Sequence, residues 1–284
     1  MRVPRFSLFW LGIGVVSTLV LSYFFYFCKC KFDVWNLTPT QRVINAKLAR
    51  EGESFKGLQY DLIGPSQAPD TLKEYVVLGY NIMVRTQEYA PGYAGNRLCC
   101  TNCHFAAGIS TGGKRAGISL AGVSASYPQY STRSKRVISL RDRINNCFQR
   151  SMNGKALPMD SKEMIALETY FQWISKNFPI YQDVPWLGSG YIDSKHTPDA
   201  KAGEAIYNYN CALCHGANGE GDNQIPPLWG PESFNDGAGM NIMTMLSPFV
   251  YQNMPYTDPT LTPEQALDVA AYIISRPRPH FEKK

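Results

Sequence analysis

Two short cysteine–histidine motifs carry the clearest chemistry in this chain. They consist of Cys100, Cys103 and His104 in the first copy and of Cys211, Cys214 and His215 in the second. In a Cys-x-x-Cys-His motif the thiols bond covalently to the haem vinyl groups, and the histidine supplies the proximal nitrogen to the iron. A reduced dithiol or half of a zinc site explains neither the following histidine nor its recurrence. The sequence therefore predicts two covalently bound haem c groups, which implies the periplasmic side of a membrane.

The second haem also needs a distal ligand, for which methionine thioethers are the candidates. Met254 is followed directly by Pro255, whose fixed φ helps to hold a mobile thioether over the iron. Methionine raises the reduction potential relative to two histidines, which suits a haem that passes electrons onward. We therefore predict His215 and Met254 as its ligands. The residues interpreted instead as loop, core or surface positions are Met240, Met243, Met245, His196 and His280.

The distal ligand of the first haem is less clear from the residues alone. Cys147 follows the first motif at about the distance at which Met254 follows the second. A thiolate ligand lowers the potential of haem iron sharply, which indicates sulfur chemistry at the haem face. Two alternatives stay open. In one, Met152 binds the iron, with Met159 near enough to compete, and Cys147 is a free buried cysteine; in the other, Cys147 forms a disulfide with Cys99.

The segment around Cys147 is strongly basic. Between residues 133 and 155 the only acidic residue is Asp142, whereas the basic residues are Arg133, Lys135, Arg136, Arg141, Arg143, Arg150 and Lys155. Guanidinium groups bind oxyanions through a fixed fork of donors, and Ser151 offers a hydroxyl. Arg133 and Arg143 are the better candidates for an anion pocket. A solvated face, or a docking face for an acidic redox partner, is the alternative interpretation.

Length, charge and helical periodicity define the architecture. The 284 residues suffice for two small domains, and a net charge of +5 is too weak to indicate nucleic-acid binding. Apolar residues recur at helical spacing over 70–83 and 160–174 around the first motif, with Asp70 and Asp160 as expected helix starts. The same plan recurs around the second motif, from Asp199 and again from Thr262.

This repeat predicts an all-α fold of two cytochrome c-type domains in tandem behind an N-terminal transmembrane or signal segment. The predicted parts are a signal-anchor or transmembrane segment (1–31), a tether and N-terminal extension with a short helix near 41–50 (32–65), a first cytochrome c domain (66–178), a linker (179–198) and a second cytochrome c domain (199–280).

The N-terminus fits a membrane-facing compartment. Arg2 and Arg5 precede an uncharged apolar run over 6–27, which is long for a signal-peptide core and has no small-x-small cleavage site after it. We expect an uncleaved anchor on the periplasmic side of the bacterial inner membrane; a cleaved signal that leaves a soluble periplasmic protein is the alternative. No chemistry is assigned to Cys28, Cys30 or Cys99.

Several stretches together resemble one family, the dihaem thiosulfate dehydrogenases, which interconvert thiosulfate and tetrathionate. They are the first haem motif, Tyr127-Pro128-x-Tyr130, and Arg143-Ile144-Asn145-x-Cys147-Phe148-x-x-Ser151-Met152-Asn153-Gly154. The resemblance implies that His104 and Cys147 bind the first haem iron in a catalytic domain. It also implies that Arg133, Arg143 and Ser151 line the thiosulfate pocket, and that the second domain transfers electrons.

The expected function is therefore a dihaem oxidoreductase that couples two thiosulfates to tetrathionate. The electrons would pass through the second haem to an external acceptor or donor such as a small cytochrome c. A membrane-anchored dihaem electron carrier without catalysis is the main alternative. A sulfur-transfer cytochrome of the thiosulfate-oxidising multienzyme systems is another. The sequence does not fix the direction of the reaction, the electron partner or the oligomeric state.

Overall fold

The computed structural model describes residues 62–181 and 183–282. The predicted membrane or signal segment, the short helix expected near 41–50, Cys28 and Cys30 lie outside these residues. Within the described ranges, no helix combines the length and the apolar character needed to cross a membrane.

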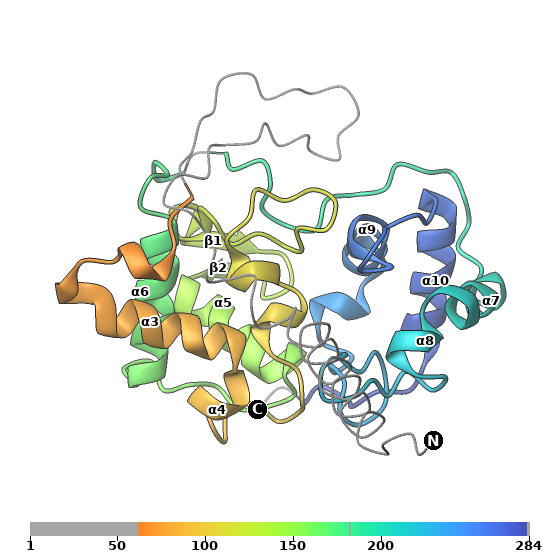
Figure 1. Ribbon diagram of the computed structural model, residues 1–284, viewed down its shortest axis with the longest axis horizontal. Coiled ribbons are helices and arrows are strands. Elements are labelled where there is room, and N and C mark those ends of the chain that lie inside the picture. The colour runs from red at the N-terminus through yellow and green to blue at the C-terminus, as the bar shows by residue number, and fades with distance from the viewer. Residues whose placement is uncertain (1–61, 182, 283–284) are drawn as a thin grey trace, which may run out of the picture. The chain divides into compact units, whose positions relative to one another are not determined.

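The first domain is built on two packed helices, α3 (Asp70–Val84) and α6 (Lys162–Ile174), with the short α4 (Thr86–Tyr89) after α3 (Figure 1). Val76, Ile82 and Leu167 lie in the core between them. The helices touch at Gly79, where an added Cβ would lie 2.2 Å from the carbonyl oxygen of Ala166. Glycine is therefore required at this crossing because any side chain would push the helices apart.

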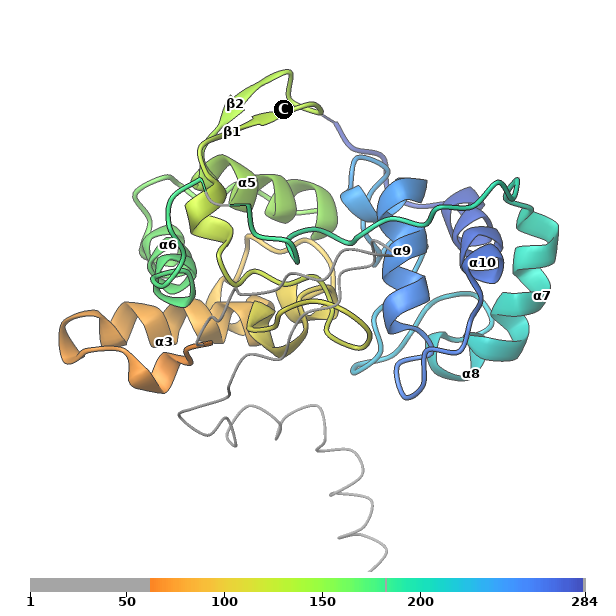
Figure 2. The ribbon, with the colours of Figure 1, turned by 90° about the horizontal axis from the view of Figure 1, so that it is seen from above.

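The second domain repeats this plan with α7 (Ala200–Asn210), α8 (Ala212–His215), α9 (Met243–Asn253) and α10 (Pro263–Ser275). Helix α10 packs against both α7 and α9 (Figure 2). Here Gly203 of α7 takes the place of Gly79, because its added Cβ would lie 2.0 Å from the carbonyl oxygen of Asp268. Two helix pairs that cross at a glycine confirm the predicted tandem arrangement.

The helix starts were predicted with mixed success. Asp199 and Thr262 cap α7 and α10 through their side chains, as predicted. Ser161, and not Asp160, caps α6. Asp70 is the first residue of α3, because Pro69 occupies the cap position. The two misplaced starts are off by one residue; at α6 the neighbouring Ser161 supplies the cap, and at α3 the cap position is Pro69, which has no capping side chain.

A small β-hairpin is the exception to the all-α prediction. Strands β1 (Gln129–Ser131) and β2 (Arg136–Ile138) pair antiparallel, with Tyr130 opposite Val137. Both of these side chains are exposed, and Ile138 at the end of β2 is the one buried side chain of the two strands, so the hairpin shows no alternating pattern. It leads into α5 (Leu140–Asn146), which continues as a π-helical turn, η5 (Cys147–Ser151) (Figure 2).

The remaining elements are short and irregular. Single 3₁₀ turns cover Pro65–Gln67, Cys100–Asn102, Phe105–Gly108, Val123–Ser126 and Gly239–Asn241. Part of the predicted linker packs on the first domain: Val184 and Trp186 are buried beside Phe178, and the Trp186 indole donates to the carbonyl of Ala121. Leu98 of the first domain is buried in the core of the second, so the two cytochrome domains share packing.

Candidate active site and haem-binding residues

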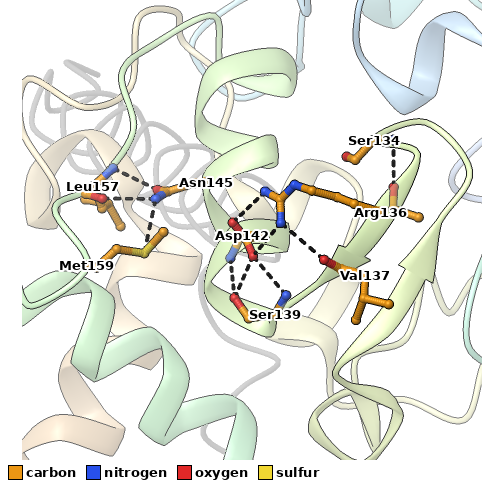
Figure 3. Close-up of polar contacts among 9 residues, drawn as sticks. Ser134, Arg136, Val137, Ser139, Asp142, Asn145, Leu157 and Met159 are labelled. Carbon is orange, nitrogen blue, oxygen red and sulfur yellow. Dashed lines mark hydrogen bonds and ion pairs between the residues drawn. The ribbon is translucent and has the colours of Figure 1, made fainter.

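The start of α5 is fixed by a polar cluster that joins it to the hairpin. Ser139 caps the helix by accepting a hydrogen bond from the backbone N–H of Asp142, and the Asp142 carboxylate accepts one from the Ser139 N–H. Arg136 of β2 forms an ion pair with the same carboxylate at 3.1 Å (Figure 3). This capping box and ion pair set the direction in which α5 presents its last turn.

Asn145 fixes the other side of α5. Its buried amide donates to the carbonyl of Leu157 at 3.0 Å and accepts from the Leu157 N–H at 2.8 Å (Figure 3). The Asn145 side chain therefore both donates to and accepts from the backbone of Leu157, as paired residues of neighbouring β-strands do. Because both bonds are buried, they hold the final turn of α5 rigidly against the segment that follows the π-helical turn.

Arg143 and Cys147 meet on one face of this held helix. They are four residues apart, and Nη1 of Arg143 donates a 2.7 Å hydrogen bond to Sγ of Cys147. The electrostatic interaction with the Cys147 side chain is the main cause of a raised pKa of Arg143. Tyr127 lies beside the same guanidinium, and burial raises the pKa of its phenol. The arrangement presents an accessible sulfur with a cation in contact.

The residues of the alternative assignments lie in different surroundings. Met152 is buried in the apolar core of the first domain, whereas Cys147 is half-buried and accessible. Met159 is largely exposed, with its sulfur 4.0 Å from the Asn145 amide. Cys99 and Cys147 are both free thiols, and Sγ of Cys99 lies 3.0 Å from Oγ1 of Thr101.

The first haem motif has the donor set that a c-type haem requires. Nδ1 of His104 is hydrogen-bonded to the carbonyl of Ile118 at 2.8 Å, which leaves Nε2 as the nitrogen for iron. Burial lowers the pKa of His104 to about 4, so the ring is neutral and can act as a ligand. Burial, with a smaller contribution from the nearby Cys147, raises the pKa of Cys103 to about 12. Cys147 thus lies close to the attachment cysteine Cys103.

The second motif is arranged in the same way. Nδ1 of His215 is hydrogen-bonded to the carbonyl of Pro226 at 2.9 Å, and burial lowers the pKa of this histidine. Cys211 and Cys214 are free thiols at the start and end of α8. Both motifs therefore fit a covalently attached haem, with the histidine tautomer set by a backbone carbonyl.

Met254 directly follows α9 as its C-cap residue. It is half-buried and packs against the core of the second domain. The sulfur of Met245 accepts a hydrogen bond from Ser189, and Met240 is buried. His196 and His280 pair with Asp268 and Asp236 at 2.6 Å, so each has a carboxylate partner.

Three guanidinium groups gather at this site, one more than the sequence predicted. Arg133 and Arg150 each donate a 3.2 Å hydrogen bond from Nη1 to the same acceptor, the carbonyl oxygen of Gly237. Burial lowers the pKa of both, and the charge of Arg143 lowers them further. Arg150 belongs to the basic segment of the sequence, but no role of its own was predicted for it. The signal available in the sequence was its position between Cys147 and Ser151; in the structure these residues form one π-helical turn, a feature frequent at functional sites.

The π-helical turn is clamped by two asparagines. The Asn96 amide donates to the backbone carbonyls of Ser151 and Ser233, which belong to different domains. Asn235 of the second domain is fully buried; it donates from its backbone to the Arg150 carbonyl and from its amide to the Gln149 carbonyl. The candidate site is therefore formed by both domains.

Comparisons with known proteins agree with this architecture. Residues 92–180 match the family model described as SoxA/TsdA, cytochrome c domain, and residues 200–276 match the one described as Cytochrome c. A thiosulfate dehydrogenase of Thiomonas intermedia is 41% identical over 219 residues, covering 74% of this chain and 68% of the relative. One of Allochromatium vinosum is 38% identical over 223 residues, covering 76% and 83%.

Among solved structures, the thiosulfate dehydrogenase TsdBA of Marichromatium purpuratum superposes with a TM-score of 0.70 at 32% identity. The match covers 78% of this chain and 50% of the TsdBA chain, so this chain corresponds to half of that protein.

Proposed function

The chain belongs to the thiosulfate dehydrogenase family, a group of c-type dihaem enzymes, and we propose that it couples two thiosulfates to tetrathionate at Cys147. Family membership favours an enzyme over the electron-carrier alternative. The observation that carries the proposal is the 2.7 Å contact between the Arg143 guanidinium and the Cys147 sulfur. A thiolate that is accessible and held by a cation is suited to nucleophilic sulfur chemistry.

Each bound haem supplies a one-electron acceptor, so two haems match the two electrons released per tetrathionate. His104 and Cys147 would hold the iron of the first haem, and His215 and Met254 would hold that of the second. Arg133, Arg143 and Ser151 are the proposed substrate-binding residues around the first.

The proposed reaction has two stages at the Cys147 sulfur. In the first, a bond forms between Sγ of the Cys147 thiolate and the sulfane sulfur of one thiosulfate, with the loss of two electrons. The product is a cysteine S-thiosulfonate. In the second, the sulfane sulfur of another thiosulfate attacks that of the adduct, which releases tetrathionate and restores the Cys147 thiolate. This second stage is a thiol–disulfide exchange and needs no further oxidant.

Electrostatics sets the main barrier that the residues must lower. Two thiosulfate dianions and a thiolate repel one another strongly in a site of low dielectric. Arg143 offsets charge at the reacting sulfur, and Arg133 offsets it nearby, with donors fixed before substrate arrives. Because the second stage is reversible, the same residues would also serve tetrathionate reduction.

The wider setting is also part of the proposal. We place the chain on the periplasmic side of the bacterial inner membrane, anchored by residues 6–27 or released by signal cleavage. We propose a small cytochrome c as the external electron partner. The two haem attachment motifs support the compartment, because such haems are attached there.

The test is thiosulfate-dependent reduction of ferricyanide by the full-length, haem-loaded protein at mildly acidic pH, with tetrathionate quantified as the product. Cys147→Gly is expected to abolish turnover while both haems remain covalently attached. Cys99→Ser is the matched cysteine control and should retain activity, because Ser keeps the contact with Thr101. Near-normal tetrathionate production by Cys147→Gly would contradict the proposal.

A further inference from the structure

Three arginines of the candidate site have no carboxylate partner among the described residues. Elsewhere in the same segment arginines are neutralised: Arg136 pairs with Asp142, and Arg141 pairs with Glu168 at 2.7 Å. In the part of the chain that the structure describes, no ion pair involves the three arginines that surround the site, Arg133, Arg143 and Arg150.

Arg150 is held in this cluster by the second domain. Its guanidinium carbon lies 4.5 Å from the centre of the Phe281 ring, while Nη1 donates to the Gly237 carbonyl. Phe281 is fixed in turn by Asp236, whose carboxylate accepts a 2.7 Å hydrogen bond from the Phe281 N–H. Gly237 must be glycine here, since an added Cβ would lie 2.7 Å from the Phe281 side chain.

Bringing Arg133 and Arg150 to one carbonyl oxygen is electrostatically unfavourable. A single neutral acceptor cannot offset the repulsion between two cations, and both are partly withdrawn from water. The buried Nε of Arg150 also has no acceptor among the described residues. A cluster of this kind is stabilised when an oxyanion binds it.

We propose that Arg150 is a third oxyanion-binding residue of the site, held by Gly237 and Phe281 of the second domain, and that it binds the sulfonate group of the second thiosulfate. This inference rests on the proposed function. Tetrathionate has a sulfonate at each end and its new S–S bond in the middle, so the pocket needs two separate oxyanion sites. Arg143 is engaged with the Cys147 sulfur, where the bond forms. The Arg133–Arg150 pair supplies a site away from that sulfur, and the incoming dianion can occupy it while its sulfane sulfur attacks the Cys147 adduct.

The experiment compares Arg150→Gln with the wild-type holoenzyme in steady-state thiosulfate kinetics and in calorimetric titration with sulfate. Loss of a charged hydrogen-bond donor should raise the KM for thiosulfate about tenfold or more and weaken sulfate binding by a similar factor. Phe281→Leu removes the ring that supports the guanidinium and should raise KM roughly two- to fivefold. Arg150→Lys should fall between wild type and Arg150→Gln, because it keeps the charge but not the fork.

Arg85→Gln is the matched control. Arg85 also stacks on an aromatic ring, that of Tyr89 at 5.0 Å, and its removal changes the net charge equally without touching the pocket. KM and sulfate affinity of Arg150→Gln equal to those of Arg85→Gln would overturn the inference.

A haem propionate is the other oxyanion that Arg150 could bind, and a potentiometric titration of both haems distinguishes it. A shifted first-haem potential with unchanged KM and sulfate affinity would assign Arg150 to the propionate and overturn the inference. If the wild-type protein forms no tetrathionate, the proposed function fails, and the assignment to the second thiosulfate fails with it; unchanged sulfate affinity in Arg150→Gln would then also remove Arg150 as an oxyanion site.

Discussion

The backbone N–H of Gly117 donates a buried 2.8 Å hydrogen bond to Oδ1 of Asn253, and this bond joins the two haem sites. Gly117 directly precedes Ile118, whose carbonyl is hydrogen-bonded to the His104 ring. Asn253 directly precedes Met254. The proximal ligand of one haem and the proposed distal ligand of the other are therefore linked through a short, buried path.

Asn253→Leu is predicted to disturb both haems. The amide also donates to the carbonyl of Phe249 four residues earlier, so its removal frees the end of α9 that carries Met254. We expect the near-infrared band of His/Met ligation to weaken and the potential of the second haem to fall, with a smaller change at the first. Asn210→Ala is the control, because Asn210 makes the same bond to the residue four earlier but none across the domains. Unchanged spectra and potentials in Asn253→Leu would disprove the link.

Arg143→Gln is predicted to lower the turnover number more than it raises KM. The guanidinium touches the reacting sulfur itself, so its loss removes charge stabilisation where the bond forms. Removal of one such donor typically costs roughly a hundredfold in rate. Stopped-flow and steady-state kinetics would measure the loss, with Arg85→Gln as the charge control; a purely KM-based effect would place Arg143 with ground-state binding instead.

Asn235→Ala is predicted to destabilise the protein by about 1–3 kcal/mol, because it leaves buried backbone groups without partners. Its amide donates to the Gln149 carbonyl and to Oδ1 of Asn153, on either side of Arg150 and Ser151. Thermal unfolding of the holoprotein measures the loss, and the KM for thiosulfate should rise as the turn loosens. A stability change without any change in KM would mean that the clamp does not position the pocket.

The pairing of His280 with Asp236 predicts that the C-terminal tail, which supports Arg150 through Phe281, is stabilised over a limited pH range. Asp236 raises the pKa of His280 above its ordinary 6.5. The stability that protonated His280 contributes is therefore complete below pH 6.5 and is lost as the pH rises through the pKa of His280 in the folded protein. Hydrogen bonds from Phe281 and His280 lower the pKa of Asp236 below its ordinary 3.8, so that contribution is lost as pH falls through the folded pKa.

The difference in melting temperature between wild type and His280→Gln should therefore be largest between about pH 4 and 6.5 and should shrink on either side. Asp236→Asn and the double variant complete a cycle that isolates the pair. A difference in melting temperature that does not vary with pH would show that the His280–Asp236 pair does not stabilise the protein.

Local chemistry explains which features the sequence could predict. Both haem motifs, the helices α3, α6, α7 and α10 and the caps Asp199 and Thr262 follow from residue type and short spacing, and the structure has these helices within about two residues of the predicted ranges. Cys147 could be singled out but not paired, because its neighbour Arg143 had several basic rivals along the same segment. Arg143 can be distinguished from the other basic residues only once α5 is known to be helical, because a helix brings residues four apart into contact.

The missed features depend on contacts between distant residues. Arg150 and the Gly237 carbonyl are 87 residues apart, and Gly117 and Asn253 are 136 apart. No periodic pattern encodes a backbone carbonyl as an acceptor for two arginines. The hairpin was missed for another reason: its three-residue strands expose Tyr130 and Val137, so neither shows the alternation of a half-buried strand.

The shared carbonyl of Gly237 restricts how this protein can be rebuilt. A chimera that joined the first domain to a foreign electron-transfer domain would keep its own haem attachment site, the Arg143–Cys147 contact and a complete helical core. It would nevertheless lose the acceptor for Arg133 and Arg150, and with it the Asn235 clamp on the π-helical turn that carries Arg150. Modular recombination of these two halves would therefore have to carry the loop 233–239 and the tail 278–281 along with the first domain, although both lie beyond it in the sequence.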